Sequence, residues 1–211
     1  MKSYIVFDFD GVVFDSFRAV FEVLRSMHSK YGLSELREEN FKDLFLGNVW
    51  ETYEKTGVGS DRIEAFKSDF RELFKKKQQQ IQLFDGMREC LQAFSNIFGM
   101  IIVSSNHAEA IREMLEQEGL LGYFSSILGS EAGDSKREKI TAFLAAHQSP
   151  DMQAFFVSDT SGDILDVAGL GIFSIAVSWG YHSAESLSAS KPDKIVSSPR
   201  ELQSFLLSKA M

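Results

Sequence analysis

Residues 3–16 read SYIVFDFDGVVFDS, an apolar run that ends in closely spaced acids. The β-branched and aromatic residues of Ser3–Phe9 predict a short strand. Asp8 and Asp10 stand two positions apart at its end, so their side chains would point to the same side. Taken alone, the pair is explained as well by a turn acid and a helix N-cap. A chemical role therefore depends on what the rest of the chain places beside these two carboxylates.

The spacing of the apolar residues changes directly after this segment. Between residues 15 and 77 they recur at helical intervals, starting with Phe17, Val20 and Leu24, and no convincing strand interrupts them. After residue 84 the pattern changes again, to strands that alternate with helices. The changes of period predict two domains, a core made of residues 1–15 and 85–211 and an all-helical insertion at residues 16–84.

The core pattern is specific enough to predict its elements. Strands are predicted at Ile97–Val103, Tyr123–Leu128, Ala154–Val157, Phe173–Val177 and Lys194–Val196. Helices are predicted at His107–Glu118, Ser135–His147, Thr160–Ala168 and Pro199–Leu207. Continuous apolar strands separated by amphipathic helices indicate a parallel sheet covered on both faces. The predicted fold class is α/β, a doubly wound parallel sheet with the all-helical insertion after its first strand.

Polar side chains gather where the predicted strands end, which is where open α/β sheets bind their ligands. The second core strand ends in Ser104–Asn106, and the fourth is followed by Asp159 and Asp163. Lys136 begins the helix after the third strand. Each group alone is explained by helix capping or by a surface position. Because all of them occur in order at strand exits or helix starts, they predict one shared site with the first acid pair.

This set of residue types suits phosphoryl transfer. Clustered carboxylates repel one another and need a cation, and oxygen-only ligands favour Mg²⁺ over zinc. Phosphoryl transfer needs neutralised phosphate oxygens, in-line positioning and a proton for the leaving group. One aspartate can attack phosphorus to form an aspartyl-phosphate, while a second supplies general acid and base catalysis.

The ordered motifs resemble those of the haloacid dehalogenase-like (HAD) hydrolase superfamily, in its phosphoglycolate phosphatase-like branch with a helical cap. The similarity covers the whole chain and rests on four motifs, at Asp8–Ser16, Ile101–Asn106, Lys136 and Phe156–Asp163. It implies an α/β core of the HAD-like Rossmannoid type, and it makes the insertion at residues 16–84 the cap.

The resemblance implies a role for each motif residue. Asp8 would be the nucleophile, and Asp10 would protonate the leaving oxygen and then activate water. Ser104 would hold phosphoryl oxygens, and Lys136 would neutralise the nucleophile and the phosphate. The other implied phosphate-binding residues are Phe9, Gly11, Ser105 and Asn106. The implied Mg²⁺ ligands are Asp8, Asp159 and the backbone carbonyl of Asp10, with Asp163 either as a further ligand or as a residue that supports the ligands.

Three details depart from the family pattern or qualify it. Val12 stands where Thr is commoner after Gly11, a change that some relatives tolerate. Ser158 stands where Gly usually precedes the first acid of the fourth motif, which leaves both acids in place. Arg137 and Lys139 flank Lys136, and Lys136 is preferred as the motif lysine for its spacing to Ile140.

The cap would close over the site, exclude water and set specificity. Its candidate substrate contacts are Arg18, Lys42, Asn48 and Trp50. Packing inside the cap is the simpler explanation for Trp50 and its aromatic neighbours.

The function predicted from these motifs is a Mg²⁺-dependent phosphatase of a small phosphomonoester, of the phosphoglycolate or sugar phosphate type, acting through an aspartyl-phosphate. A phosphoglucomutase-like phosphotransferase on the same fold stays open as an alternative. A phospho-accepting signalling module is also open, although here the acid pair lies on the first strand and a cap follows it. Dehalogenation is disfavoured because relatives with that activity lack the acid that Asp10 supplies.

Composition limits the partners. The 211 residues contain 22 Lys+Arg and 30 Asp+Glu, a net charge of −8, which argues against nucleic acid and anionic membranes. Cys90 is the one cysteine, so no internal disulfide can form. No apolar run approaches the roughly 20 residues that span a bilayer. We expect a cytoplasmic monomer or homodimer whose partner is a small phosphorylated metabolite.

Overall fold

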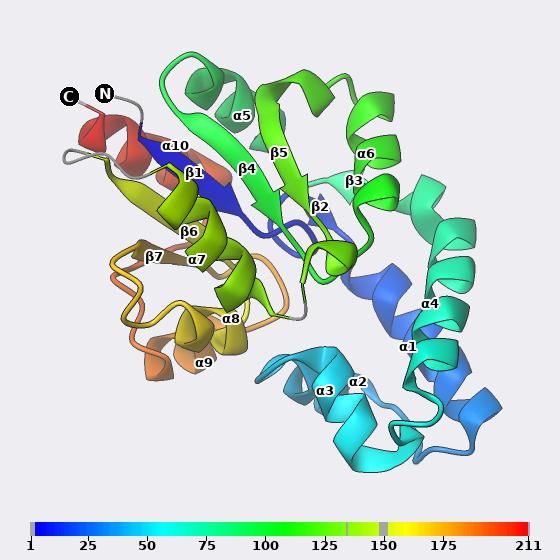
Figure 1. Cartoon of the computed structure of the whole chain (residues 1–211). Coiled ribbons are helices and arrows are strands. Elements are labelled where there is room, and N and C mark those ends of the chain that lie inside the picture. Colours follow the sequence, from blue (N-terminus) through cyan, green and yellow to red (C-terminus); the bar gives the residue numbers. More distant parts are fainter. Residues whose placement is uncertain (1–2, 134, 148–151, 211) are drawn as a thin grey trace.

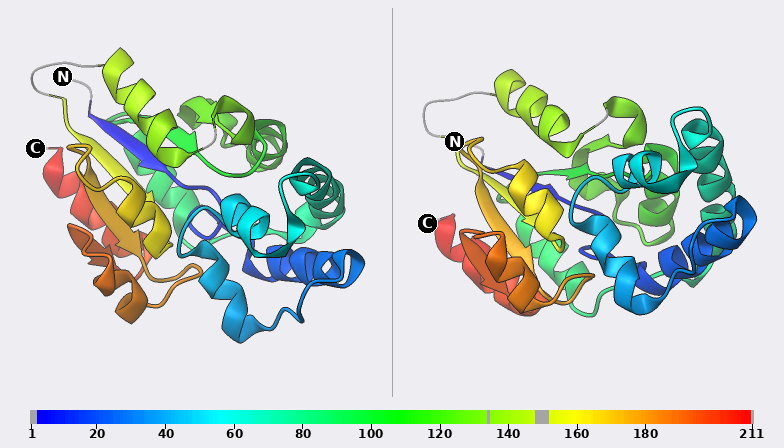
Figure 2. Two further views of the ribbon diagram at one scale, coloured as in Figure 1. Left: turned by 60° about the horizontal axis from the view of Figure 1, so that its bottom comes forward. Right: turned by 90° about the horizontal axis from the view of Figure 1, so that it is seen from below.

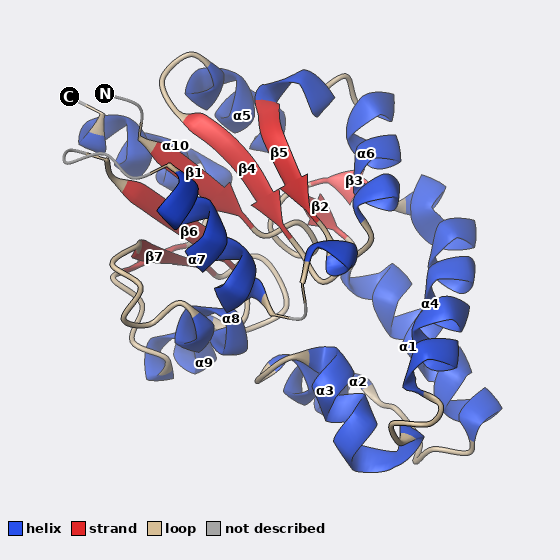
Figure 3. Ribbon diagram, viewed as in Figure 1, coloured by secondary structure: helices blue, strands red, loops and turns tan. Residues whose placement is uncertain are grey.

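A parallel sheet runs through the core of the computed structural model, which describes residues 3–133, 135–147 and 152–210 (Figure 1 and Figure 3). Within those residues the sheet has six strands in the order β5-β4-β1-β6-β7-β8. They are β1 (Tyr4–Phe7), β4 (Gly99–Val103), β5 (Phe124–Leu128), β6 (Ala154–Ser158), β7 (Phe173–Val177) and β8 (Lys194–Val196). The chain starts in the middle of the sheet, adds strands on one side and then returns to the other side. The predicted doubly wound α/β fold is confirmed.

The register aligns the carboxyl ends of the three central strands. Phe7, at the end of β1, is paired with Ile102 in β4 and with Val157 in β6. Asp8 follows directly, and its N–H donates to the Val157 carbonyl at 2.9 Å. The residues after these strands therefore emerge at one edge, at the point where the winding direction reverses.

Helices cover both faces of the sheet. The core helices are α5 (Met87–Ser95), α6 (Ala108–Gln117), α7 (Lys136–Ala146), α8 (Ser161–Asp166), α9 (Ala184–Ala189) and α10 (Pro199–Lys209). Successive residues of β1 point to opposite faces. Ile5 and Phe7 join an apolar cluster with side chains of α5 and α10, whereas Val6 joins a separate cluster with side chains of α7. Figure 2 shows α7 and α10 on opposite sides of the sheet.

The cap is helical, as predicted. Its α-helices are α1 (Phe17–Tyr31), α2 (Glu38–Phe41), α3 (Val49–Tyr53) and α4 (Ile63–Lys77), with 3-10 turns at Lys42–Phe45 and Gln78–Gln80 and a π turn at Glu54–Val58. Aromatic rings hold these helices together. Phe66 of α4 packs on Tyr31 of α1 and on Tyr53 of α3, with ring centroids 4.9 and 4.6 Å apart. The apolar residues of the cap belong to the same cluster as one face of the sheet.

Two short elements at the base of the cap have no counterpart in the sequence prediction. β2 (Phe14–Asp15) and β3 (Gln82–Leu83) pair in antiparallel fashion where the chain leaves and re-enters the core. Strands of two residues carry no readable alternation, and this pair forms between segments far apart in the chain. The pairing brings the two connections of the cap side by side.

Candidate active site

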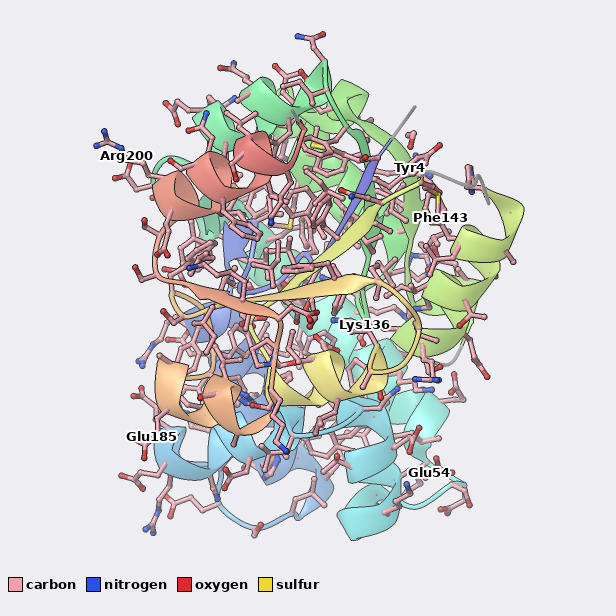
Figure 4. The ribbon with its side chains drawn as sticks, turned by 90° about the vertical axis from the view of Figure 1, so that its left-hand side faces the viewer. Tyr4, Glu54, Lys136, Phe143, Glu185 and Arg200 are labelled. Carbon is pink, nitrogen blue, oxygen red and sulfur yellow. The ribbon has the colours of Figure 1, made fainter. Side chains whose placement is uncertain are left out.

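A buried ion triad joins three of the predicted motifs. Lys136 Nζ lies 2.6 Å from Asp8 Oδ2 and 2.7 Å from Asp163 Oδ2. The lysine is the first residue of α7, whose N-cap Ser135 accepts a hydrogen bond from the Glu138 N–H. Figure 4 shows Lys136 in the middle of the molecule, between the core and the cap. Asp8 and Lys136 are only 4% and 7% exposed, so each charge is stabilised by the other more than by water.

Burial and the neighbouring opposite charges shift the pKa values of these three groups in opposite directions. Burial raises the pKa of Asp8, and the Lys136 ammonium offsets only part of this effect. Burial is also the largest single effect on Asp163 and acts to raise its pKa, but the Lys136 charge together with hydrogen bonds to Lys136, Asp8 and Ser158 lowers that pKa. For Lys136, burial favours the neutral form, whereas Asp163 and Asp8 favour the ammonium and raise its pKa. The lysine therefore stays charged beside Asp8.

Asp10 faces the second strand end. Its Oδ2 accepts a hydrogen bond from Asn106 Nδ2 at 3.3 Å, while its Oδ1 is buried without a hydrogen-bond partner. Burial raises the pKa of Asp10, and hydrogen bonds from Ser16 and Asn106 act against this rise. A carboxyl group with a raised pKa holds a proton more readily, which is what a general acid requires.

Asp159 is packed between two glycine-containing loops. Its Oδ2 accepts a hydrogen bond from the Tyr181 N–H at 2.7 Å, while its Oδ1 is buried without a partner. Burial raises the pKa of Asp159 to about 7. A Cβ atom on Gly11 or on Gly180 would collide with the Asp159 carboxyl group, and Gly11 also has a φ of +76°. Both positions therefore require glycine.

The donor set fits a Mg²⁺ ion. Asp159 Oδ1 is a buried carboxyl oxygen without a hydrogen-bond partner, and a bound cation would satisfy it. Asp163 is different, because its Oδ2 already accepts hydrogen bonds from Lys136 Nζ and Ser158 Oγ, both at 2.7 Å. Among the described residues, no three His, Cys, Asp or Glu side chains are arranged as a finished metal cluster. The described residues thus include candidate ligands, but these do not form a complete coordination geometry.

The second strand end supplies hydroxyl and amide groups. Ser104 Oγ accepts a hydrogen bond from the Asn106 N–H at 3.0 Å, and the Ser104 carbonyl accepts one from Lys139 Nζ at 2.9 Å. The Ser105 carbonyl accepts a hydrogen bond from the indole Nε1 of Trp50 at 3.3 Å. This last bond connects the cap directly to the predicted phosphate-binding loop.

A cavity of about 80 Å³ brings most of the predicted residues together. The predicted site residues that line it are Asp8, Asp10, Ser104, Ser105, Asn106, Lys136 and Asp163. Asp159 lies outside this lining. Phe9 and Gly11 also lie outside it. In this structure the Phe9 N–H donates to Asp8 Oδ1 at 2.7 Å and the Gly11 N–H donates to the Phe14 carbonyl at 2.9 Å, so the phosphate-binding roles implied for these amides stay predictions.

The four candidate substrate contacts of the cap fall into two pairs. Asn48 and Trp50 line the cavity, whereas Arg18 and Lys42 do not. Arg18 forms ion pairs with Glu22 and Glu38, and the Lys42 ammonium lies over the Phe17 ring. Both cations are thus used on the outside of the cap.

Several lining residues were not predicted from the sequence. Thr160, Asp166 and Tyr181 come from the core, and Val20, Leu24 and Phe70 come from the cap. Asp166 follows Asp163 by three positions on α8, a spacing that places both on one helix face. That spacing is a signal in the sequence. The apolar residues carry no such signal, because their pattern is that of any cap core.

Comparison with known proteins identifies this arrangement. The family model for haloacid dehalogenase-like hydrolases matches residues 5–177, which include the four motifs. The chain belongs to this family. Membership in the HAD-like hydrolases makes the protein an enzyme and confirms the resemblance found in its sequence.

Relatives of the chain share a common name. A phosphoglycolate phosphatase of Vibrio parahaemolyticus is 28% identical over 213 residues, covering 94% of this chain and 93% of the relative. One of Synechococcus elongatus is 26% identical and covers 94% of each chain. A solved HAD-like hydrolase of Streptococcus pneumoniae matches with a TM-score of 0.82 and 24% identity, over 97% of this chain and 98% of its own. In the described part of this HAD-like hydrolase, no helix is long and apolar enough to cross a bilayer.

Proposed function

We propose that this HAD-like hydrolase is a Mg²⁺-dependent phosphatase that hydrolyses a small phosphomonoester through an aspartyl-phosphate. The observation that carries the proposal is the buried ammonium of Lys136, held 2.6 Å from the Asp8 carboxylate in a cavity that Asp10 also lines. A nucleophile, a fixed cation and a separate acid thus meet in one small cavity. The names of the sequence relatives support a phosphatase.

The proposed reaction has two steps. An oxygen of Asp8 attacks phosphorus, the bond from phosphorus to the ester oxygen breaks, and Asp10 gives its proton to the departing alcohol. Water then attacks the phosphorus of the aspartyl-phosphate, and Asp10 takes a proton from that water. The Asp8–phosphorus bond breaks, and inorganic phosphate and free Asp8 result.

The remaining groups orient the reacting groups and neutralise their negative charge. Lys136 offsets the negative charge that gathers on Asp8 and the phosphoryl group, and Asp163 holds the lysine in place. Ser104 and the loop after it offer a hydroxyl group and amides to phosphoryl oxygens. Asp8, Asp159 and the backbone carbonyl of Asp10 would hold the Mg²⁺ ion, which when bound neutralises phosphoryl oxygens. Of the two roles implied for Asp163, we propose that of support, because its Oδ2 already accepts hydrogen bonds from Lys136 Nζ and Ser158 Oγ.

The test is a phosphate-release assay over a panel of small phosphomonoesters. We expect release with MgCl₂ and none with EDTA. Asp8→Asn should lower kcat by at least about a thousandfold, because the amide is no longer a nucleophile. Asp85→Asn, an exposed acid outside the site, is the matched control and should keep activity. Release of phosphate at the wild-type rate by Asp8→Asn would contradict the proposal.

Transfer of phosphate to a second position of the substrate, without free phosphate, would favour the mutase alternative. The cytoplasmic location and the oligomeric state stay predictions.

A further inference from the structure

The wall that the cap contributes to the cavity is mostly apolar. Val20 and Leu24 come from α1, Val49 from α3 and Phe70 from α4. Val20 is 6% exposed and Leu24 is 1% exposed, so their side chains are part of the packed interior. The polar exception is Asn48, whose Oδ1 accepts hydrogen bonds from the N–H groups of two following residues. On the side of the cavity that the cap forms, a leaving group would contact mainly methyl groups and aromatic rings.

The charged groups of the cavity all come from the core. The described lining contains the carboxyl groups of Asp8, Asp10, Asp163 and Asp166 against the single ammonium of Lys136. That ammonium is already paired with two of the carboxylates. No Lys or Arg of the cap belongs to the described lining. An additional anion on the leaving group would therefore be buried among carboxylates without a partner, which is costly.

Some of the cations of the cap line a neighbouring polar cleft of about 820 Å³. Lys55 pairs there with Glu51 at 2.9 Å, and Lys67 pairs with Glu64 at 2.8 Å. Arg71 lines the same cleft. In phosphoglycolate the carboxyl carbon stands only two bonds from the ester oxygen. Its carboxylate would therefore lie close to the phosphoryl group, in the cavity that Asp8 and Asp10 line.

We propose that the preferred substrate is a phosphomonoester of an uncharged, mainly apolar small alcohol, and that phosphoglycolate is a poor substrate. This inference rests on the proposed phosphatase function and narrows it. The basis is the pairing of an apolar cap wall with a core surface that is already rich in carboxylates. A polyhydroxylated sugar fits less well for the same reason, because the wall offers few hydrogen-bond partners for its hydroxyl groups.

The test compares 2-phosphoglycolate with isobutyl phosphate, in which two methyl groups replace the two carboxylate oxygens at nearly the same size. Phosphate release with MgCl₂ gives kcat/KM for each ester. We expect isobutyl phosphate to have the higher kcat/KM by at least about tenfold, which corresponds to about 1.4 kcal/mol. Equal or faster hydrolysis of phosphoglycolate overturns this inference and leaves the proposed function standing. If neither these esters nor the wider panel gives Asp8-dependent phosphate release, the proposed function fails.

Three variants locate the cause of the preference. Leu24→Lys adds a cation to the apolar wall and should raise the phosphoglycolate to isobutyl phosphate ratio of kcat/KM by at least about tenfold, while Leu24→Met, of similar length but uncharged, should keep the wild-type ratio. Arg71→Ala removes a cation from the polar cleft and should also keep that ratio. A selective loss of phosphoglycolate hydrolysis in Arg71→Ala would show that the cleft binds the carboxylate and would overturn the inference. The Arg71 measurement does not depend on the folding of the Leu24 variants.

Discussion

Lys136 is the residue on which the charge balance of the site depends, because it separates two buried carboxylates at 2.6 and 2.7 Å. Lys136→Met keeps the length of the side chain and removes its charge. We expect the free energy of unfolding at pH 7 to fall by about 3 kcal/mol, since Asp8 and Asp163 are left uncompensated. Urea unfolding followed by circular dichroism measures this change, and phosphate release should fall by at least about a hundredfold.

The matched control is Lys76→Met. Lys76 pairs with Glu72 on the exposed side of α4, with side chains 64% and 70% exposed. Removal of such a pair should change the free energy of unfolding by less than about 0.5 kcal/mol. Equal stability losses in the two variants would contradict a special role for the buried triad.

Ser158 gives a second prediction for a single residue. It is fully buried, and its Oγ donates to Asp163 Oδ2 at 2.7 Å, so the hydroxyl group helps to hold the partner of Lys136. Ser158→Gly restores the residue usual in the family and removes this hydrogen bond. We expect a loss of about 1–2 kcal/mol in the free energy of unfolding with kcat kept within about threefold, since no reacting group is lost.

Ser158→Ala separates the hydroxyl group from the backbone freedom of glycine. It removes the same hydrogen bond and keeps the Cβ atom, so it should lose less stability than Ser158→Gly. Denaturant unfolding and the phosphate assay check both variants. A stability gain in Ser158→Ala would show that the hydroxyl group does not support Asp163.

At the scale of elements, Trp50 joins α3 of the cap to the loop after β4. Its indole donates to the Ser105 carbonyl at 3.3 Å, and its ring packs on Phe70 with centroids 5.1 Å apart. Trp50→Phe keeps an aromatic ring and removes the hydrogen bond that connects the cap with the phosphate-binding loop. We expect KM to rise by about threefold to tenfold, with a smaller change in kcat, because the loss of one hydrogen bond weakens closure over the substrate.

Trp179→Phe is the control for this prediction. The indole of Trp179 also donates to a backbone carbonyl, that of Val12 at 3.2 Å, but Trp179 does not line the cavity. Its replacement should cost similar stability and leave KM unchanged. Steady-state kinetics on both variants decides the matter, and a KM that rises equally in both would argue against a role for Trp50 in closure.

On the scale of the whole molecule, a buried thiol and two buried phenol groups should make the stability of the fold fall at alkaline pH. Burial raises the pKa of Cys90 from its ordinary 9.0 to about 12 and also raises the pKa of Tyr53 and Tyr181. The folded state therefore keeps protons that the unfolded chain releases. This contribution to stability is complete below pH 9 and is lost as the pH rises toward the folded pKa, at up to about 1.4 kcal/mol per pH unit for each group.

Cys90→Ala tests that sign. The variant should lose stability less steeply than the wild type between pH 9 and pH 11, although it is less stable at pH 7 because a buried side chain is shortened. Urea unfolding at several pH values gives both slopes. Identical slopes, or a folded wild-type thiol that reacts with a disulfide reagent at pH 8 as fast as the unfolded chain, would contradict the prediction.

Much of the architecture was predictable because it depends on periodicity. The six core strands and the helical cap follow from the spacing of apolar residues, which burial on a sheet or on a helix demands. Helix α5 shows where the prediction stopped short. Four of its residues, Met87, Cys90, Leu91 and Phe94, are buried at helical spacing, yet no helix is predicted there from the sequence. The strand predicted from Ile97 begins at Gly99 in the structure, as β4. Ile97 is 45% exposed, so it lies outside the buried run.

The sequence by itself determined the order of the motifs, and therefore which acids, hydroxyl group and lysine meet at one sheet edge, since parallel strands place their carboxyl ends together. Only the tertiary structure decided which of those groups pair with one another and which face the cavity. It pairs Lys136 with Asp8 and Asp163, leaves one oxygen each of Asp10 and Asp159 without a partner, and turns Arg18 and Lys42 away from the cavity. These outcomes depend on distances of a few ångströms between segments far apart in the chain, and the spacing of residues along the chain does not encode such distances.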